Sequence, residues 1–137
     1  MSQALIGFIA GLRNADKNAL NVSVVGSLTN TVKVATAVSV GAGATVNLTT
    51  AGQILDARNF SRFSVASKAN SSHSHTLSSN GYSDLIGNDS IGLISAAGTS
   101  VSRNINNGVL VMDYVGASIT NSDTVSHTYD VWLRLMQ

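Results

Sequence analysis

His73-Ser74-His75 is the local arrangement in this sequence that most resembles a metal site. In a β-strand, residues i and i+2 point to the same side, so two imidazoles could chelate one ion. His127 or an aspartate could supply a third ligand, although the sequence places neither one nearby. The simpler interpretation puts both histidines in a polar serine-rich loop or on an exposed strand face. We therefore assign no metal and no cofactor, and leave metal binding by His73 and His75 open.

The remaining candidates for catalysis lack the spacing that each chemistry needs. The chain has no cysteine, hence no thiol nucleophile, and its seven acidic residues are scattered aspartates. A Ser-His-Asp triad has no G-x-S-x-G elbow to present its serine. Gly41-Ala42-Gly43-Ala44 lacks the spacing and the lysine of a phosphate loop, and Asp84, Asn88 and Asp89 do not fit an EF-hand. We expect no enzyme and no small-molecule substrate.

The composition indicates β-structure. Charged residues are 11% of the chain, proline is absent, and polarity comes from Ser, Thr and Asn mixed with Val, Ala and Gly. Such residues disfavour helices and suit strands and turns. The formal net charge of +1 provides no overall field for nucleic acid or an anionic membrane, so we expect neither as a partner.

Alternating apolar residues mark the strands that must hold any site. The clearest run is Thr31–Val40, with Val32, Val34, Thr36, Val38 and Val40 on one face. In the last strand, Tyr129, Val131, Leu133 and Leu135 share one face. Further candidates are 20–26, 46–48, 60–67, 71–79, 90–94, 99–105 and 109–119. Turns are expected at Gly41-Ala42-Gly43, Asn80-Gly81, Asn106-Asn107-Gly108 and Asn121-Ser122-Asp123.

About eight or nine short strands with regular turn signals, and no long helical pattern between them, predict an all-β fold. We expect a single β-sandwich of antiparallel strands, jelly-roll or Ig-like, because strand order cannot be seen in a sequence. The predicted organisation is an N-terminal arm or short helix over residues 1–19 and a β-sandwich domain over 20–137.

The first twelve residues are apolar, with Leu5, Phe8, Ile9 and Leu12 at helical spacing. The stretch is too short to span a membrane and lacks the charged start of a signal peptide. Two interpretations remain open. The segment either packs on the core of its own domain or forms an arm that docks on a neighbouring subunit.

The last strand offers a second candidate interface. Trp132, Arg134 and Met136 alternate with the apolar stripe and so point to its opposite side. Trp and Arg are enriched among residues that dominate binding energy. These three side chains either form an exposed anchor or are covered within the domain, and the sequence favours neither.

Two stretches carry a resemblance to a known group. Ile54–Val65, in which Leu55-Asp56 is followed by Phe60 and Phe63, resembles a segment of small β-sandwich virion proteins of tailed bacteriophages. The closing 128–135 is similar to the terminal strand of those proteins, and Asn80-Gly81-Tyr82 lies where they have a small turn. The resemblance consists of strand patterns over roughly the last two thirds of the chain. It carries over no receptor, sugar or metal motif.

The resemblance implies a capsid decoration, or cement, protein on the outer surface of a virion. Such a protein forms homo-oligomers, trimers being favoured, and clamps adjoining subunits of the major capsid protein. The apolar arm would then be a tether. The alternative is a carbohydrate-binding or fibre/baseplate-type β-sandwich module, which requires an exposed aromatic platform such as Tyr82, Tyr114 and Trp132 together.

Overall fold

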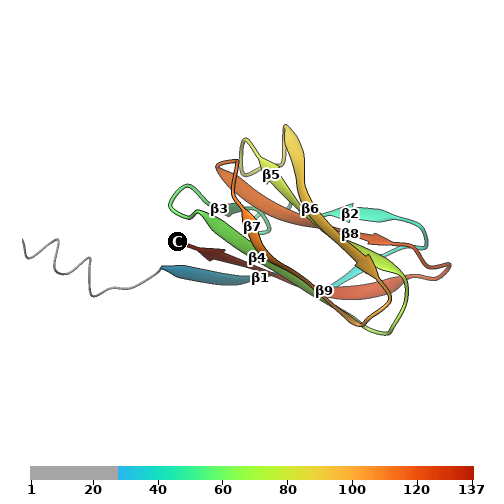
Figure 1. Cartoon of the computed structure of the whole chain (residues 1–137). Coiled ribbons are helices and arrows are strands. Elements are labelled where there is room, and N and C mark those ends of the chain that lie inside the picture. The colour runs from blue at the N-terminus through green and yellow to red at the C-terminus, as the bar shows by residue number, and fades with distance from the viewer. Residues whose placement is uncertain (1–27) are drawn as a thin grey trace, which may run out of the picture.

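A computed structural model describes residues 28–137, all of whose regular structure is β (Figure 1). The predicted arm and the predicted strand at 20–26 lie outside the described residues. Within residues 28–137, no helix is long and apolar enough to cross a membrane. Nine strands follow in chain order: β1 (Thr29–Val40), β2 (Thr45–Asn47), β3 (Leu55–Asp56), β4 (Arg62–Ala69), β5 (His75–Tyr82), β6 (Ser90–Gly98), β7 (Ser102–Val109), β8 (Tyr114–Asn121) and β9 (His127–Met136).

The strands form two antiparallel sheets that face each other. Sheet A has the order β1-β9-β4-β7, and sheet B has the order β2-β8-β5-β6 with β3 added beside β8. The first two strands pair with the last two, β1 with β9 and β2 with β8, as in a jelly roll. The predicted all-β sandwich is confirmed, and the strand order selects the jelly-roll alternative over the Ig-like one.

The core follows the predicted stripe of the last strand. Tyr129, Val131, Leu133 and Leu135 are all fully buried. β9 hydrogen-bonds to β1 on one side and β4 on the other, so it lies inside sheet A. The apolar layer is completed by Phe63 and Val65 from β4 and by Val115, Ala117 and Ile119 from β8.

The predicted strand at Thr31–Val40 is present, but its strict alternation is wrong. The pairing of β1 with β9 shifts register between Lys33 and Ala35 and again between Ala35 and Val38. Ala37 adopts a positive φ of 48° at the second irregularity. As a result Ala35 is buried and Thr36 is exposed, the reverse of the predicted faces. β-Bulges add residues to one strand and so invert the alternation that follows them.

Two predicted turns are wrong, because these residues lie inside strands and their glycines leave room for a neighbouring side chain. Asn80-Gly81 lies inside β5, where a Cβ on Gly81 would come within 2.6 Å of Met112 Cγ. Gly108 lies inside β7, where a Cβ would overlap the Phe63 ring. The turn at Gly41–Gly43 is confirmed by the hydrogen bond that the Ala44 N–H donates to the Gly41 carbonyl. The turn after Asn121 is also confirmed, since β8 ends there.

Replacing Gly108 by alanine tests this packing. The added methyl would displace the buried Phe63 ring, so we expect G108A to lower the free energy of unfolding by about 1–3 kcal/mol. Gly92 is the matched strand glycine, and a methyl group added there would meet nothing within 4 Å. G92A should therefore stay within about 0.5 kcal/mol of the parent in urea denaturation. Equal losses in both variants would contradict the packing role.

Candidate functional site

The outer face of sheet A holds the predicted anchor residues. Trp132 and Met136 are half-buried and Arg134 is exposed, all opposite the buried stripe of β9. None of the described elements forms a further layer over this face, which lies on the outside of the sandwich (Figure 1). Residues 28–137 therefore supply no second layer over these three side chains. The role of these residues in an interface stays a prediction.

Neighbouring strands bring cations to the same face. Lys33 of β1 is the register partner of Trp132. On the other side, Arg62 and Lys68 of β4 are the partners of Met136 and Asp130. We call the resulting surface the basic face; it comprises Lys33, Arg62, Lys68, Trp132, Arg134 and Met136. Sequence reasoning missed it, because its cations come from three strands far apart in the chain.

The carboxylate on this face is held by the fold itself. Asp130 accepts a hydrogen bond from the Ala37 N–H at 2.8 Å and forms an ion pair with Lys33 Nζ at 3.1 Å. These contacts, with the Ala37 bond the largest cause, lower the pKa of Asp130. Lys33 Nζ also lies 5.1 Å from the centre of the Trp132 ring, a cation–π distance. Among the described residues, no ion pair involves Arg62, Lys68 or Arg134, so the face is positive.

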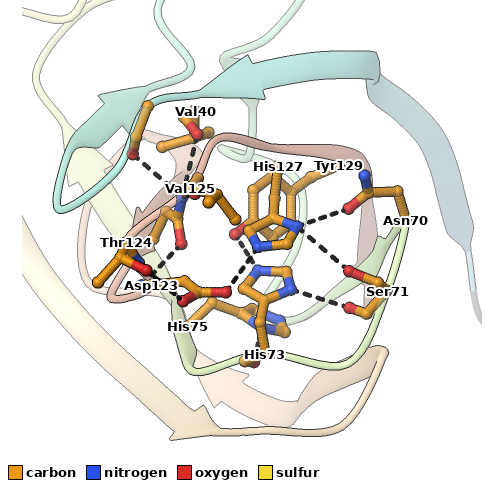
Figure 2. Close-up of polar contacts among 12 residues, drawn as sticks. Val40, Asn70, Ser71, His73, His75, Asp123, Thr124, Val125, His127 and Tyr129 are labelled. Carbon is orange, nitrogen blue, oxygen red and sulfur yellow. Dashed lines mark hydrogen bonds and ion pairs between the residues drawn. The ribbon is translucent and has the colours of Figure 1, made fainter.

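A second cluster lies between the sheets at one end of the sandwich and contains all three histidines (Figure 2). His75 begins β5, His127 begins β9, and His73 lies in the connection between β4 and β5. All three are buried, and the His73 and His127 rings stack with centroids 3.4 Å apart. His73 does lie in the polar serine-rich connection that the sequence suggested, but its side chain is buried, and His75 lies on a buried rather than an exposed strand face.

Hydrogen bonds fix the ring tautomers of two histidines. The Nδ1–H of His75 donates to the His73 carbonyl at 3.0 Å, and the Nδ1–H of His73 donates to the Ser71 carbonyl at 2.9 Å. His73 Nε2 then accepts a hydrogen bond from the Tyr129 hydroxyl at 2.5 Å. Burial, and next the charge of Asp123, raise the pKa of Tyr129 to about 12, which keeps it a donor. Both imidazoles therefore carry a proton on Nδ1, directed to a backbone carbonyl.

His127 joins the cluster to two surface segments. Its Nε2 lies 2.8 Å from Asp123 Oδ2, and its Nδ1 lies 3.2 Å from Ser71 Oγ and 3.0 Å from Asn70 Oδ1. Ser71, His127 and Asp123 therefore touch in series, as in a hydrolase. In the usual triad the serine meets Nε2 and the aspartate meets Nδ1, which is the reverse of this order. Asn70 Oδ1 also bonds to His127 Nδ1, the nitrogen that would have to accept the proton of Ser71. The geometry supports a structural network.

The arrangement that would let His73 and His75 chelate an ion from one strand face is not present. His73 precedes β5, and the rings meet at 4.8 Å between centroids. Both Nδ1 atoms and the Nε2 of His73 are directed to protein partners. In the described part of the chain, no group of three or more histidine and acidic side chains has a geometry that could hold a metal ion.

The other predicted site residues separate in space. The predicted aromatic platform of Tyr82, Tyr114 and Trp132 does not form. Tyr82 is buried and pairs with Tyr114 in sheet B, while Trp132 lies in sheet A. Asp84 accepts bonds from the N–H groups of Ile86 and Asn88, as a turn residue does. The arm residues Leu5, Phe8, Ile9 and Leu12 lie outside the described residues.

His75 should make stability depend on pH. Its Nε2 is buried without a hydrogen-bond partner among the described residues. Burial lowers the pKa of its imidazole, and the charges of His73, Arg103 and His127 add to the effect. An unfolded histidine titrates near 6.5, so the unfolded chain takes up this proton first as the pH falls. The free energy of unfolding should decrease below about pH 6.5, by at most about 1.4 kcal/mol per pH unit for one proton.

The measurement is urea denaturation between about pH 5 and 8, with H75Q as the comparison. The glutamine side chain has a similar length and does not titrate, so its profile should be flatter. Asp123, whose pKa the hydrogen bond from His127 lowers, changes its contribution only near about pH 4 and below. An unchanged slope in H75Q would show that other groups carry the dependence.

The fold is a jelly-roll β-sandwich, and no described element covers its basic face. No protein-family model matches the chain, and no curated protein matches its sequence. Among solved structures, the fold is similar to that of the PBSX exported protein XepA, with a TM-score of 0.57 and 12% identity over 79% of this chain and 36% of that one. At that identity the similarity shows the fold, and this chain spans just over a third of XepA.

Two other solved structures align over most of this chain. The VP2 subviral particle of infectious bursal disease virus matches with a TM-score of 0.47 and 16% identity, covering 81% of this chain and 32% of that one. PirA matches with a TM-score of 0.45 and 8% identity, covering 81% and 93%.

Proposed function

We propose that the protein is a structural component of a virion that decorates and stabilises a phage capsid by binding the major capsid protein. The observation that carries this proposal is the basic face, an open sheet surface with an aromatic residue at its centre and cations around it. Such a surface works by contact and charge and needs no catalytic group. The family resemblance of Ile54–Val65 and of the last strand supports the same assignment.

The contact would have the chemistry of a protein–protein hot spot. Trp132 and Met136 supply apolar area, and their half-buried state limits the entropy that they lose on binding. Arg134 and Arg62 supply planar, bidentate donors for carboxylates. The complementary patch on the shell is therefore acidic. Each contact is modest, and a homo-oligomer, trimer favoured, would convert several such contacts into tight attachment.

The test uses particles of the virus that encodes this chain, prepared without the protein. W132A/R134A should weaken co-sedimentation with these particles at least about tenfold, because each residue type often contributes more than about 1 kcal/mol at interface centres. Binding by the parent protein should also weaken at high salt, which screens the charge attraction.

Arg58 provides the matched control. It is exposed and forms an ion pair with Asp56 away from the basic face, so R58A removes one cation from the protein but none from the face. R58A should bind like the parent. If W132A/R134A keeps its fold by circular dichroism and still binds fully, the basic face is not the capsid contact.

A further inference from the structure

The four outer edges of the two sheets differ in how they are protected. Edge strands expose unpaired backbone groups, and proteins usually shield them with charges, prolines, bulges or short length. β1 has Lys33 and two register shifts, β2 has three residues, and β7 has Arg103 and a register shift opposite β4. β6 runs for nine residues without a charge or a proline, and its one shift lies near Leu93. It is the least protected edge in the described part of the chain.

An apolar groove lies beside this edge, where β6 and β7 meet at the open side of the sandwich. Its volume is about 420 Å³, and no charged side chain lines it in the described part of the chain. Ile91 and Ile94 are 45% exposed, and Val109 and Val111 are more than 60% exposed. The groove is lined by Phe63, Ile91, Leu93, Ile94, Val109 and Val111, with Gly92 and Gly108 between them. We call it the β6/β7 groove.

The chain outside the described residues contains a segment that fits this groove. Twenty-seven residues precede Leu28, and the first twelve carry no charged side chain, with Leu5, Phe8, Ile9 and Leu12 at helical spacing. Charged side chains begin only at Arg13. An apolar segment and an apolar groove match, since neither has to desolvate a charged side chain on contact.

The position where that segment joins the sandwich sets its reach. Thr29, Met136, Arg62 and Val109 form one row across sheet A, so β1 begins at the edge opposite the groove, about 14 Å away at about 4.8 Å per strand. The shortest path within one chain crosses Arg62, and the connection itself carries Arg13, Asp16 and Lys17, which leave it a net charge of +1. Like charges oppose that path. The residues between Leu12 and Leu28 can extend to roughly 50 Å, which is enough to reach a neighbour.

We infer that residues 1–12 of one copy occupy the β6/β7 groove of the next copy. The donor edge at β1 and the acceptor groove at β6/β7 lie on opposite sides of the same subunit, so each contact is head to tail. Head-to-tail contacts close into a ring when the rotation permits, and a trimer is one such ring. This inference rests on the oligomer in the proposed function and identifies the contact that would build it.

The absence of native cysteine allows a direct test in purified protein. F8C is mixed with I94C that carries a small tag, and the mixture is oxidised mildly. A disulfide-linked heterodimer should form at several times the yield seen when F8C is mixed with tagged T45C, because Thr45 is exposed on β2 at the opposite edge. The F8C/I94C double variant should give linked chains rather than an internal crosslink.

Light scattering provides the second measurement. Full-length protein should have the mass of a closed oligomer, while the variant without residues 1–12 and the groove variant I94D should both have lower mass with unchanged circular dichroism. Heterodimer yield no higher than the T45C control, an internal crosslink in the double variant, or an unchanged mass after deletion would each overturn the inference. None of these measurements uses virus particles. If the inference fails and W132A/R134A still loses capsid binding, the proposed function keeps its support.

Discussion

The rest of the structure depends on the double pairing of β9 inside sheet A. Because β1 and β4 both hydrogen-bond to it, β9 cannot slip by one residue without turning its four fully buried side chains outward. The same constraint fixes Trp132, Arg134 and Met136 on the outer face. One strand therefore sets both the core and the candidate interface, and the neighbouring strands add their cations in a register that β9 determines.

The charge of the basic face follows from a structural requirement of β1. Ala37 has a positive φ, which is unfavourable for a residue with a Cβ, and its N–H is held by the Asp130 carboxylate. That bond and the Lys33 ion pair hold the carboxylate toward β1, and in the described part of the chain it forms no ion pair with the cations on β4 and β9. The bulge that shields the β1 edge thus leaves Arg62, Lys68 and Arg134 available to a partner.

Sequence reasoning predicted those features that depend on local alternation and missed those that depend on packing across sheets. β9 was predicted with the correct faces because no bulge interrupts it, whereas the bulges of β1 inverted Ala35 and Thr36. Asn80-Gly81 has the composition of a turn, but Met112 requires the glycine within a strand. The histidine cluster and the basic face join residues that are distant in sequence, so no spacing rule could bring His73 to His127 or Arg62 to Arg134.

The two clusters share β9 but respond to different conditions. His127 and Tyr129 face the interior at the start of the strand, and Arg134 and Met136 lie on the outer face near its end. The basic face carries lysine and arginine side chains and one carboxylate, Asp130, whose pKa is lowered. Between about pH 5 and 7, a pH effect of this chain on partner binding would act through His75, because burial lowers the pKa of its imidazole and so makes folding stability depend on pH. Salt, in contrast, weakens the electrostatic attraction between the basic face and a partner, but it screens the buried histidine network much less.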